Sequence, residues 1–383
     1  MIEKVSCINL SSPYGDGNIF GSPSGLKSVS VIEIVDQNGV KGYGEAYSGV
    51  YAPTIVKHYI DLIGDDLIGM PIEVSERFHR ITNKHCISMS GVVKSIVGAI
   101  EIALFDVLAK RQGKSLYKFL FRDNNRESIP LKCYYSGGSA VLSPDQITQD
   151  VERAIGLGHN AYKMRVGLQE NDAERVGSAR QSLGDRNLMC DAIQSTLHSW
   201  SLGESISNLK KMSGYNLFWA EEFVDPSDPA DVFRLRAECP DANLAFGESF
   251  TTLNEFYSLS QLNCLDVAQP DVSQCGGIRT AIKICLSLEG KCDKVAFHVW
   301  GGPVAIAANL HLAMAMQSCF PGAEIWFEVP AVCLQLTEDL LSLRIENGYV
   351  GSIEDLGLGV EITDEIKDKY RFVEDSSFKD TRE

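Results

Sequence analysis

Short hydrophobic runs recur through the second half of the chain, and each run ends near a charged or ionisable residue. Their ends lie roughly 23 to 30 residues apart, about the length of one strand–loop–helix–loop unit. Parallel strands joined by helices are covered on both faces, so they appear as continuous apolar runs. Repetition of this unit predicts a (β/α) barrel. The run ends are Asp191 in NLMCD, Glu221 in LFWAE, Glu248 in LAFGE, Asp271 in LDVAQPD, His298 in KVAFH and Glu328 in EIWFE, preceded by Lys163 and Arg165 in AYKMRVG.

The residues that end these runs are expected to share one polar site. Catalytic residues of (β/α) barrels collect at the carboxyl ends of the strands, and charged groups are rarely buried without a partner. An acidic residue after a strand can also cap the next helix, which explains any single position equally well. The occurrence of Asp191, Glu221 and Glu248 in the same register favours the shared site.

The first part of the chain has a different pattern, which predicts an α+β unit separate from the barrel. Residues 28–47 form two β-rich runs around Asn38-Gly39, a strong hairpin signal. Apolar residues then recur at helical spacing from Ile55 to about Phe121. We therefore predict three parts, with boundaries at 1–126 for the α+β unit, 127–335 for the barrel and 336–383 for a C-terminal segment.

Two segments of the N-terminal unit have the composition of surface loops. Residues 11–25 are rich in Gly, Ser and Pro, and residues 47–53 are rich in aromatic side chains. Ordinary connections and lids that close over a site both have this composition. As lids, these segments would bring Tyr14 and Tyr47 to the substrate.

Composition limits the class of protein and of partner. At 383 residues the chain exceeds the usual single core, and 44% hydrophobic residues suit a globular protein. The formal charge of −16, with no basic stripe, argues against nucleic acid and anionic membranes as partners. Eleven cysteines without CxxC pairs, no signal peptide and no membrane-spanning run indicate a reducing cytoplasm. We expect a homo-oligomer that acts on a small molecule.

The sequence resembles the enolase superfamily, in its mandelate racemase/muconate lactonizing enzyme-like branch. The resemblance rests on the register of run ends, on the helical segment 95–120 and on the motifs WAEEF, QPDVSQCGG and FHVWGG. It implies a modified TIM-type (β/α) barrel with an α+β capping domain, to which residues 336–383 would return. It also implies Mg²⁺ as cofactor. The implied site residues are the metal ligands Asp191, Glu221 and Glu248, the dyad His298 and Asp271, and the acidic Glu328.

Three positions depart from the family pattern or leave a choice open. Phe223 stands where the family usually has Pro, so Glu222 is an alternative to Glu221. Glu324 is an alternative to Glu328. On the second strand most racemases of this branch have Lys-x-Lys, whereas this chain has Lys163-Met164-Arg165.

The implied chemistry is removal of the proton α to a carboxylate. A hard divalent cation stabilises the resulting charge, and three carboxylates supply half of the octahedron that Mg²⁺ prefers. His298 is the candidate base, with Asp271 fixing its tautomer; otherwise His298 is a satisfied core histidine. Lys163 is expected at the substrate carboxylate, and Arg165 is a poor proton acceptor but a good bidentate clamp.

A racemase needs a base on each face of the reacting carbon, whereas a dehydratase needs one base and an acid. Family members that lack the second Lys are typically sugar-acid dehydratases. We therefore expect a hydro-lyase that converts a polyhydroxy monocarboxylic acid to a 2-keto-3-deoxy acid. The alternatives are a racemase or epimerase in which Lys163 or an unidentified group is the second base, and a catalytically silent barrel that binds acid sugars.

Overall fold

The computed structural model describes residues 1–15, 25–73, 78, 82, 90–120, 130–320 and 322–378. Its larger part is a closed barrel of eight parallel strands, which confirms the predicted fold class. The barrel closes where the last strand pairs with the first, with Trp326 opposite Lys132. In order, its strands are β4 (Leu131–Ser136), β5 (Ala161–Arg165), β6 (Asn187–Asp191), β7 (Leu217–Glu221), β8 (Leu244–Phe246), β9 (Val267–Ala268), β10 (Lys294–Phe297) and β11 (Glu324–Pro330).

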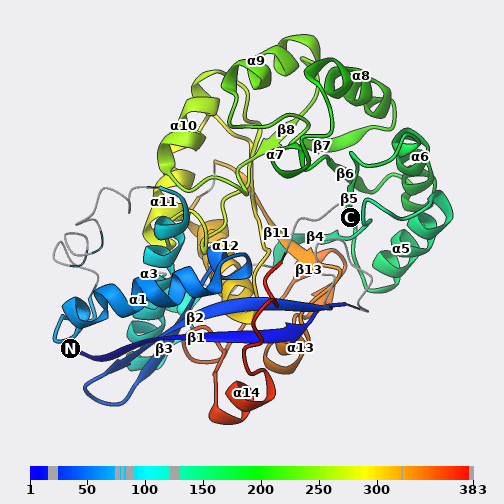
Figure 1. Cartoon of the computed structure of the whole chain (residues 1–383). Helices are drawn as coiled ribbons and strands as arrows, with labels where there is room; N and C mark the ends of the chain where they lie inside the picture. Colours follow the sequence, from blue (N-terminus) through cyan, green and yellow to red (C-terminus); the bar gives the residue numbers. More distant parts are fainter. Residues whose placement is uncertain are drawn as a thin grey trace.

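Helices connect consecutive strands and cover the outside of the barrel (Figure 1). The helices that follow Ser143 and Ser201 each begin at a capping box, in which the serine side chain accepts the amide of the third helical residue. The helices are α5 (Pro144–Gly156), α6 (Asp172–Leu183), the short α7 (Gln194–Leu197), α8 (Leu202–Ser213), α9 (Pro229–Glu238), α10 (Leu253–Gln261), α11 (Ile278–Ser287) and α12 (Pro303–Cys319). The strand β11 leads instead to α13 (Gln335–Leu340) and the C-terminal segment.

The N-terminal part is an antiparallel three-stranded sheet with helices, as predicted. The strands β2 (Leu26–Asp36) and β3 (Lys41–Ala46) form the hairpin, and Oδ1 of Asp36 accepts the amides of Asn38 and Val40 in its turn. The remaining elements are β1 (Ile2–Pro13), α1 (Pro53–Leu67), α3 (Gly91–Arg111) and α4 (Leu116–Leu120). Figure 1 shows this blue and cyan part on one side of the barrel. The expected boundary at residue 126 lies outside the described residues.

The two segments with loop composition have different outcomes. Most of the loop 11–25 lies outside the described residues. Residues 47–53 were expected to be irregular, but Tyr47–Val50 form a 3₁₀ helix, η1, that leads into α1. Contacts with distant residues order it: the amide of Tyr47 donates to the carbonyl of Ser273, and the amide of Ser48 donates to Oγ of Ser95.

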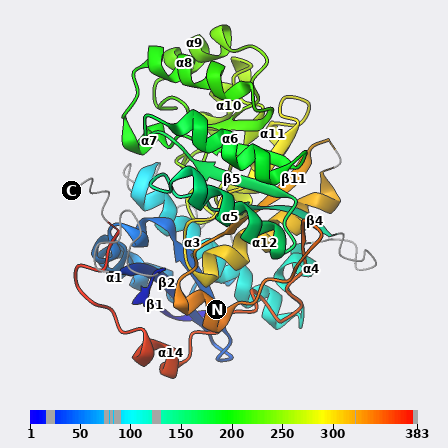
Figure 2. The ribbon, with the colours of Figure 1, turned by 90° about the vertical axis from the view of Figure 1, so that its right-hand side faces the viewer.

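The C-terminal segment contacts both the barrel and the N-terminal sheet. Its short strands β12 (Ile345–Glu346) and β13 (Tyr349–Val350) extend the barrel sheet beside β4. After α14 (Asp364–Lys369), Arg371 pairs with Leu10 of β1, and the hydroxyls of Ser376 and Ser11 lie 2.6 Å apart. Figure 2 shows α14 in red beside the blue sheet.

No disulfide forms between the cysteines that the structure describes. Ten of the eleven are described, and all ten are free thiols. Most of them are buried in the core. No helix in the described part of the chain has both the length and the hydrophobicity needed to cross a membrane.

Glycines in β3 allow α3 to pack directly on the sheet. A Cβ built on Gly44 would lie 1.8 Å from the carbonyl oxygen of Ala99, so any side chain there collides with the backbone. We expect Gly44→Ala to lower the free energy of unfolding by about 1–3 kcal/mol or more. The control is Gly64→Ala in α1, where nothing lies within 4 Å, and this change should stabilise the helix by up to about 1 kcal/mol. Denaturant titration of both variants measures the two changes, and equal stabilities would contradict the close packing.

Candidate active site

Strand alternation brings the charged run ends to one place. One side chain from each barrel strand packs in a single interior layer: Tyr134, Ala161, Met189, Trp219, Ala245, Val267, Ala296 and Trp326. Side chains two positions apart in a strand point the same way, so the residues that follow toward the carboxyl ends also point inward. In five strands these residues are Lys163, Asp191, Glu221, His298 and Glu328. Glu248 lies three positions after Ala245, past Gly247, whose φ is 133°.

Asp191, Glu221 and Glu248 form a carboxylate cluster in which one oxygen of each lies within 4.8 Å of the others. Oδ1 of Asp191 accepts the amide of Ile193 at 2.9 Å, and Oε2 of Glu221 accepts Nε1 of Trp219 at 3.1 Å. Burial and the charge of Glu221 raise the pKa of Asp191 to about 6. Burial and neighbouring carboxylates also raise the pKa of Glu248 well above its usual range.

The carboxylate cluster fits a hard divalent cation. Ligand oxygens at Mg²⁺ distances of about 2.0–2.1 Å lie roughly 3 to 4 Å apart, which is compatible with a cluster whose oxygens all lie within 4.8 Å of one another. The donor set contains carboxylates without thiols or imidazoles, which favours Mg²⁺ over zinc. The alternative ligand Glu222 adopts a left-handed φ of 44°, and its carboxylate accepts the hydroxyls of Ser195 and Ser249 instead. Glu221 is therefore the member of the cluster.

His298 is held by Asp271 on one side and faces carboxylates on the other. Its Nδ1 lies 3.1 Å from Oδ2 of Asp271, and its Nε2 lies 3.4 Å from Oε2 of Glu248. Asp271 is fixed in turn, because its Oδ1 accepts the amide and hydroxyl of Ser273 and Nδ2 of Asn309. Burial lowers the pKa of His298, but Glu248, the bond with Asp271 and Glu328 raise it to about 9.

Lys163 is buried inside the barrel, between two carboxylates. Its Nζ is 2.7 Å from Oε1 of Glu221 and 3.0 Å from Oε1 of Glu328. Its place at the substrate carboxylate stays a prediction. In this structure its ammonium pairs with Glu221 and Glu328, and it is not among the residues that line the cavity described below. Burial disfavours the Glu328 carboxylate, yet Lys163 and His298 lower its pKa to about 2. Glu324, the alternative to Glu328 as the acidic residue of the last strand, lies at the opposite end of β11 and pairs with Lys132.

A cavity of about 1310 Å³ opens above these residues, between the barrel and the N-terminal sheet. It is lined by His298, Glu248 and Glu328 from the barrel, and Tyr14 and Tyr47 from the N-terminal part. The rings of Tyr47 and His298 lie 6.2 Å apart. Both tyrosines therefore line the cavity, and their contact with substrate stays a prediction.

Arg165 lines the same cavity, and its guanidinium is held by hydrogen bonds to the end of β4 and the residue after it. Its Nη1 donates to the carbonyl of Gly137 at 3.1 Å, and Nη2 donates to Oγ of Ser136 at 3.4 Å. Burial opposes its charge, but Asp191 and Glu328 keep its pKa above the ordinary value for arginine. The guanidinium is therefore a fixed positive charge and not a proton acceptor.

Sequence reasoning missed two residues that shape the site. Asn309 of α12 donates to Asp271 and accepts the amide of Val272 through its own Oδ1. Lys27, at the start of β2, lines the cavity, and it lies just before the β-rich run that was predicted from residue 28. The only sequence signal that could have marked these two residues was a polar side chain within an otherwise apolar pattern. This applies to the Asn in α12 and to the Lys in β2.

Two family descriptions match this chain. "Enolase C-terminal domain-like" matches residues 146–366, and "Mandelate racemase / muconate lactonizing enzyme, N-terminal domain" matches residues 22–120. The chain therefore belongs to the enolase superfamily, in its mandelate racemase/muconate lactonizing enzyme branch. The resemblance stated from the motifs is confirmed.

Characterised relatives carry out different reactions. L-talarate/galactarate dehydratase of Salmonella typhimurium (strain LT2) is 30% identical over 380 residues, which cover 95% of this chain and 88% of the relative. L-Ala-D/L-Glu epimerase of Clostridium acetobutylicum is 26% identical over 344 residues, 86% of this chain and 90% of the relative. A structure of the Salmonella dehydratase, liganded with Mg and L-lyxarohydroxamate, superposes with a TM-score of 0.81 at 26% identity, covering 97% of this chain and 93% of that one. Similarity of this kind supports the superfamily chemistry and leaves dehydration and epimerisation open.

Proposed function

We propose that the protein is a Mg²⁺-dependent acid-sugar dehydratase that forms a 2-keto-3-deoxy acid. The observation that carries this proposal is that the cavity holds one well-placed base. His298 is oriented by Asp271, whereas the second-strand position that could oppose it is the guanidinium of Arg165. Lys163, the other candidate base, has its ammonium between Glu221 and Glu328. A reaction that needs a single base suits this arrangement best.

Asp191, Glu221 and Glu248 would hold the Mg²⁺. The bound ion would supply Lewis-acid stabilisation of the negative charge that develops on the substrate carboxylate. Lys163 would hold Glu221 and Glu328 in place between them. Arg165 would clamp the carboxylate or an adjacent hydroxyl from the cavity wall. Tyr14 and Tyr47 would contact the rest of the substrate from the N-terminal part.

The proton balance of the reaction needs only His298. The neutral form of the ring is the base: with Nδ1 bonded to Asp271, the lone pair of Nε2 accepts the C2 proton. Because neighbouring carboxylates raise the pKa of His298, this neutral form is favoured at alkaline pH. The electron pair left at C2 then forms the C2–C3 double bond as the C3–O bond breaks. The imidazolium returns its proton to the departing hydroxyl, which leaves as water. The enol that remains loses the proton of its C2 hydroxyl and takes up a proton at C3, with no net change in protons, and so becomes the 2-keto-3-deoxy acid.

A library of sugar acids, incubated with the Mg²⁺-loaded protein in D₂O, tests the proposal. At least one acid should give a keto acid with loss of one water, and C2 exchange should occur from one face only. Arg165→Lys restores the Lys-x-Lys pattern and should slow dehydration while opening slow exchange from the second face. Equal exchange from both faces in the unmodified protein would make it a racemase or epimerase. Mg²⁺ and acid binding without any exchange would make it a silent binding protein.

A further inference from the structure

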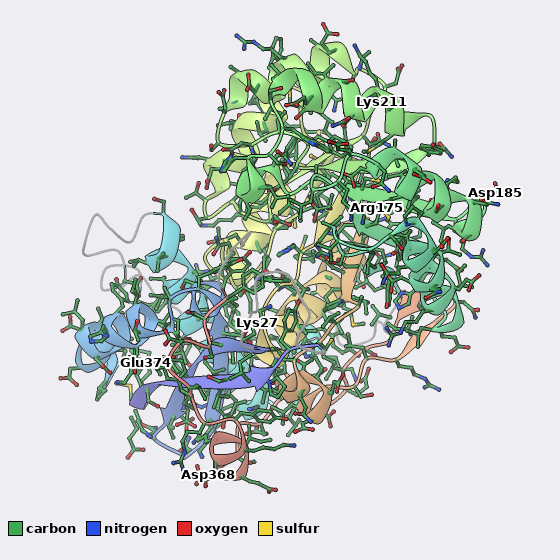
Figure 3. The ribbon with its side chains drawn as sticks, turned by 45° about the vertical axis from the view of Figure 1, so that its right-hand side comes forward. Lys27, Arg175, Asp185, Lys211, Asp368 and Glu374 are labelled. Atoms are coloured by element: carbon green, nitrogen blue, oxygen red, sulfur yellow. The ribbon has the colours of Figure 1, made fainter. Side chains whose placement is uncertain are left out.

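A second positive group of the cavity lies outside the machinery described so far. Lys27, at the start of β2, is 2% exposed and lines the cavity. Its Nζ donates to the carbonyl of Trp300 at 2.5 Å, lies 3.5 Å from the centre of the Trp300 ring and 4.8 Å from that of Tyr14. Figure 3 shows Lys27 in the middle of the molecule, far from the surface residues Lys211 and Asp368.

The ammonium of Lys27 has no carboxylate partner among the described residues. The carboxylate of Glu45, which is fully buried, accepts the amides of Gly302 and Ala305 at the start of α12 instead. A carbonyl and two ring faces compensate only part of the cost of burying a charge. Burial accordingly lowers the pKa of Lys27 to about 7, although Glu45 opposes this change. A negatively charged group in the cavity would complete the site.

Lys27 enters the cavity from a different part of the chain than the groups proposed to bind the reacting end. It holds Trp300, two residues after His298, and it enters from the N-terminal part, while the metal ligands and Lys163 come from the barrel. Trp300 and Tyr14 pack edge to face at 6.0 Å and line the cavity beside it. A substrate whose first carboxylate lies at the barrel strand ends would present its far end to this wall.

We propose that Lys27 binds a second carboxylate, at the end of the substrate remote from C2, so that the substrate is a diacid sugar. This inference rests on the proposed function for the orientation of the substrate. It replaces the single carboxylate expected from the sequence. The ammonium forms a charge-assisted bond to the carboxylate, while Trp300 and Tyr14 keep water from the pair.

Matched pairs of acids isolate the second carboxylate. Aldarates carry a carboxylate at both ends, and the corresponding aldonates of five and six carbons have a hydroxymethyl group in place of one. Binding is measured calorimetrically to the Mg²⁺-loaded His298→Asn variant, which prevents turnover. For at least one pair we expect the aldarate to bind roughly 10- to 100-fold more tightly, the range of a charge-assisted hydrogen bond.

Substitutions of Lys27 then assign that preference. Lys27→Met should reduce the ratio of the two Kd values to near one, whereas Lys27→Arg should keep it above one. If Lys27→Met does not fold, Lys27→Gln takes its place as the variant without the charge. The control is Lys57→Met, which removes the same charge from an exposed position of α1 and should leave the ratio unchanged. If Lys27 had only a structural role, its substitution would weaken the binding of the aldarate and of the aldonate equally.

The pH dependence gives an independent readout. Lys27 faces Tyr14, Glu45, Arg165, Asp271 and Cys333. Because its lowered pKa lies near 7, the free ammonium loses its charge as the pH rises, and the aldarate preference should fall between pH 6 and 9. Groups that contact the C2 end, which the aldarate and the aldonate have in common, affect both Kd values alike, so their titration cancels in the ratio of the two Kd values. The Lys27→Arg variant should keep its preference at pH 9.

Two outcomes separate this inference from the proposed function. If no aldarate binds more tightly than its aldonate, or if Lys27→Met leaves the ratio intact, Lys27 does not recognise a carboxylate, whatever the turnover. If the Lys27-dependent preference is present but no acid yields a keto acid, the dehydratase proposal fails and the diacid site stands.

Discussion

His298→Asn is expected to lower kcat by at least about 10²- to 10⁴-fold, the contribution of general acid–base catalysis. Asparagine has a similar shape and can hydrogen-bond to Asp271, but it cannot accept the C2 proton. The same variant should lose C2 deuterium exchange in D₂O, as measured by NMR on the recovered acid. Its affinity for Mg²⁺ should remain, because His298 is not among the cluster ligands.

The matched comparison is Asp271→Asn, which leaves the imidazole in place. The bond from Nδ1 of His298 would lose its charged acceptor, and the tautomer would be less well fixed. We expect a smaller loss of kcat than for His298→Asn. Unchanged C2 exchange in His298→Asn would contradict the single-base reaction and would direct attention to Lys163 as the base.

Exhaustive chelation should abolish turnover, and added Mg²⁺ should restore it. The carboxylates of Asp191, Glu221 and Glu248 point at one another, and a divalent cation offsets their repulsion. Because the cluster forms only in the folded chain, Mg²⁺ at about 100 times its Kd should add about 2.7 kcal/mol to the free energy of unfolding. Activity assays and thermal unfolding with and without chelator measure both effects.

Two glutamate variants show whether the carboxylate cluster is the site that binds Mg²⁺. Glu248→Gln removes one ligand and should weaken Mg²⁺ binding without unfolding the barrel, since its side chain is partly exposed at the cavity. Glu324→Gln removes the same charge from the opposite end of the barrel and should leave Mg²⁺ binding unchanged. Full activity after chelation, or equal Mg²⁺ affinity in both variants, would refute the metal site.

The barrel and its polar end could be predicted because both depend on a local repeat. Each strand is one short apolar run, and each inward position at its end follows from alternation along that run. The choice between neighbours could not be made from the sequence. Glu222 is excluded from the cluster by its left-handed backbone, and Glu324 by its place at the start of β11. Both depend on strand register in three dimensions.

Residues defined by contacts between distant segments were the ones missed or misplaced. Lys27 meets Trp300 across 273 positions of sequence, so nothing near it in the chain marks the cavity. The ion pairs of Lys163 with Glu221 and Glu328 could not be predicted either, because these two glutamates lie on other strands. The 3₁₀ helix at Tyr47 likewise depends on a bond to Ser273 of the barrel.

The interior layer formed by one side chain from each barrel strand has a consequence for traffic through the molecule. Trp219 and Tyr134 are completely buried within it, so the barrel axis offers no passage. Substrate, product and metal ion must all pass the rim shared with the N-terminal sheet. We expect the rates at which ligands enter and leave to depend on the N-terminal segments at this rim, and the rate of proton transfer to depend on the barrel. Recombining N-terminal segments among relatives would change how quickly ligands come and go while leaving the proton-transfer groups untouched.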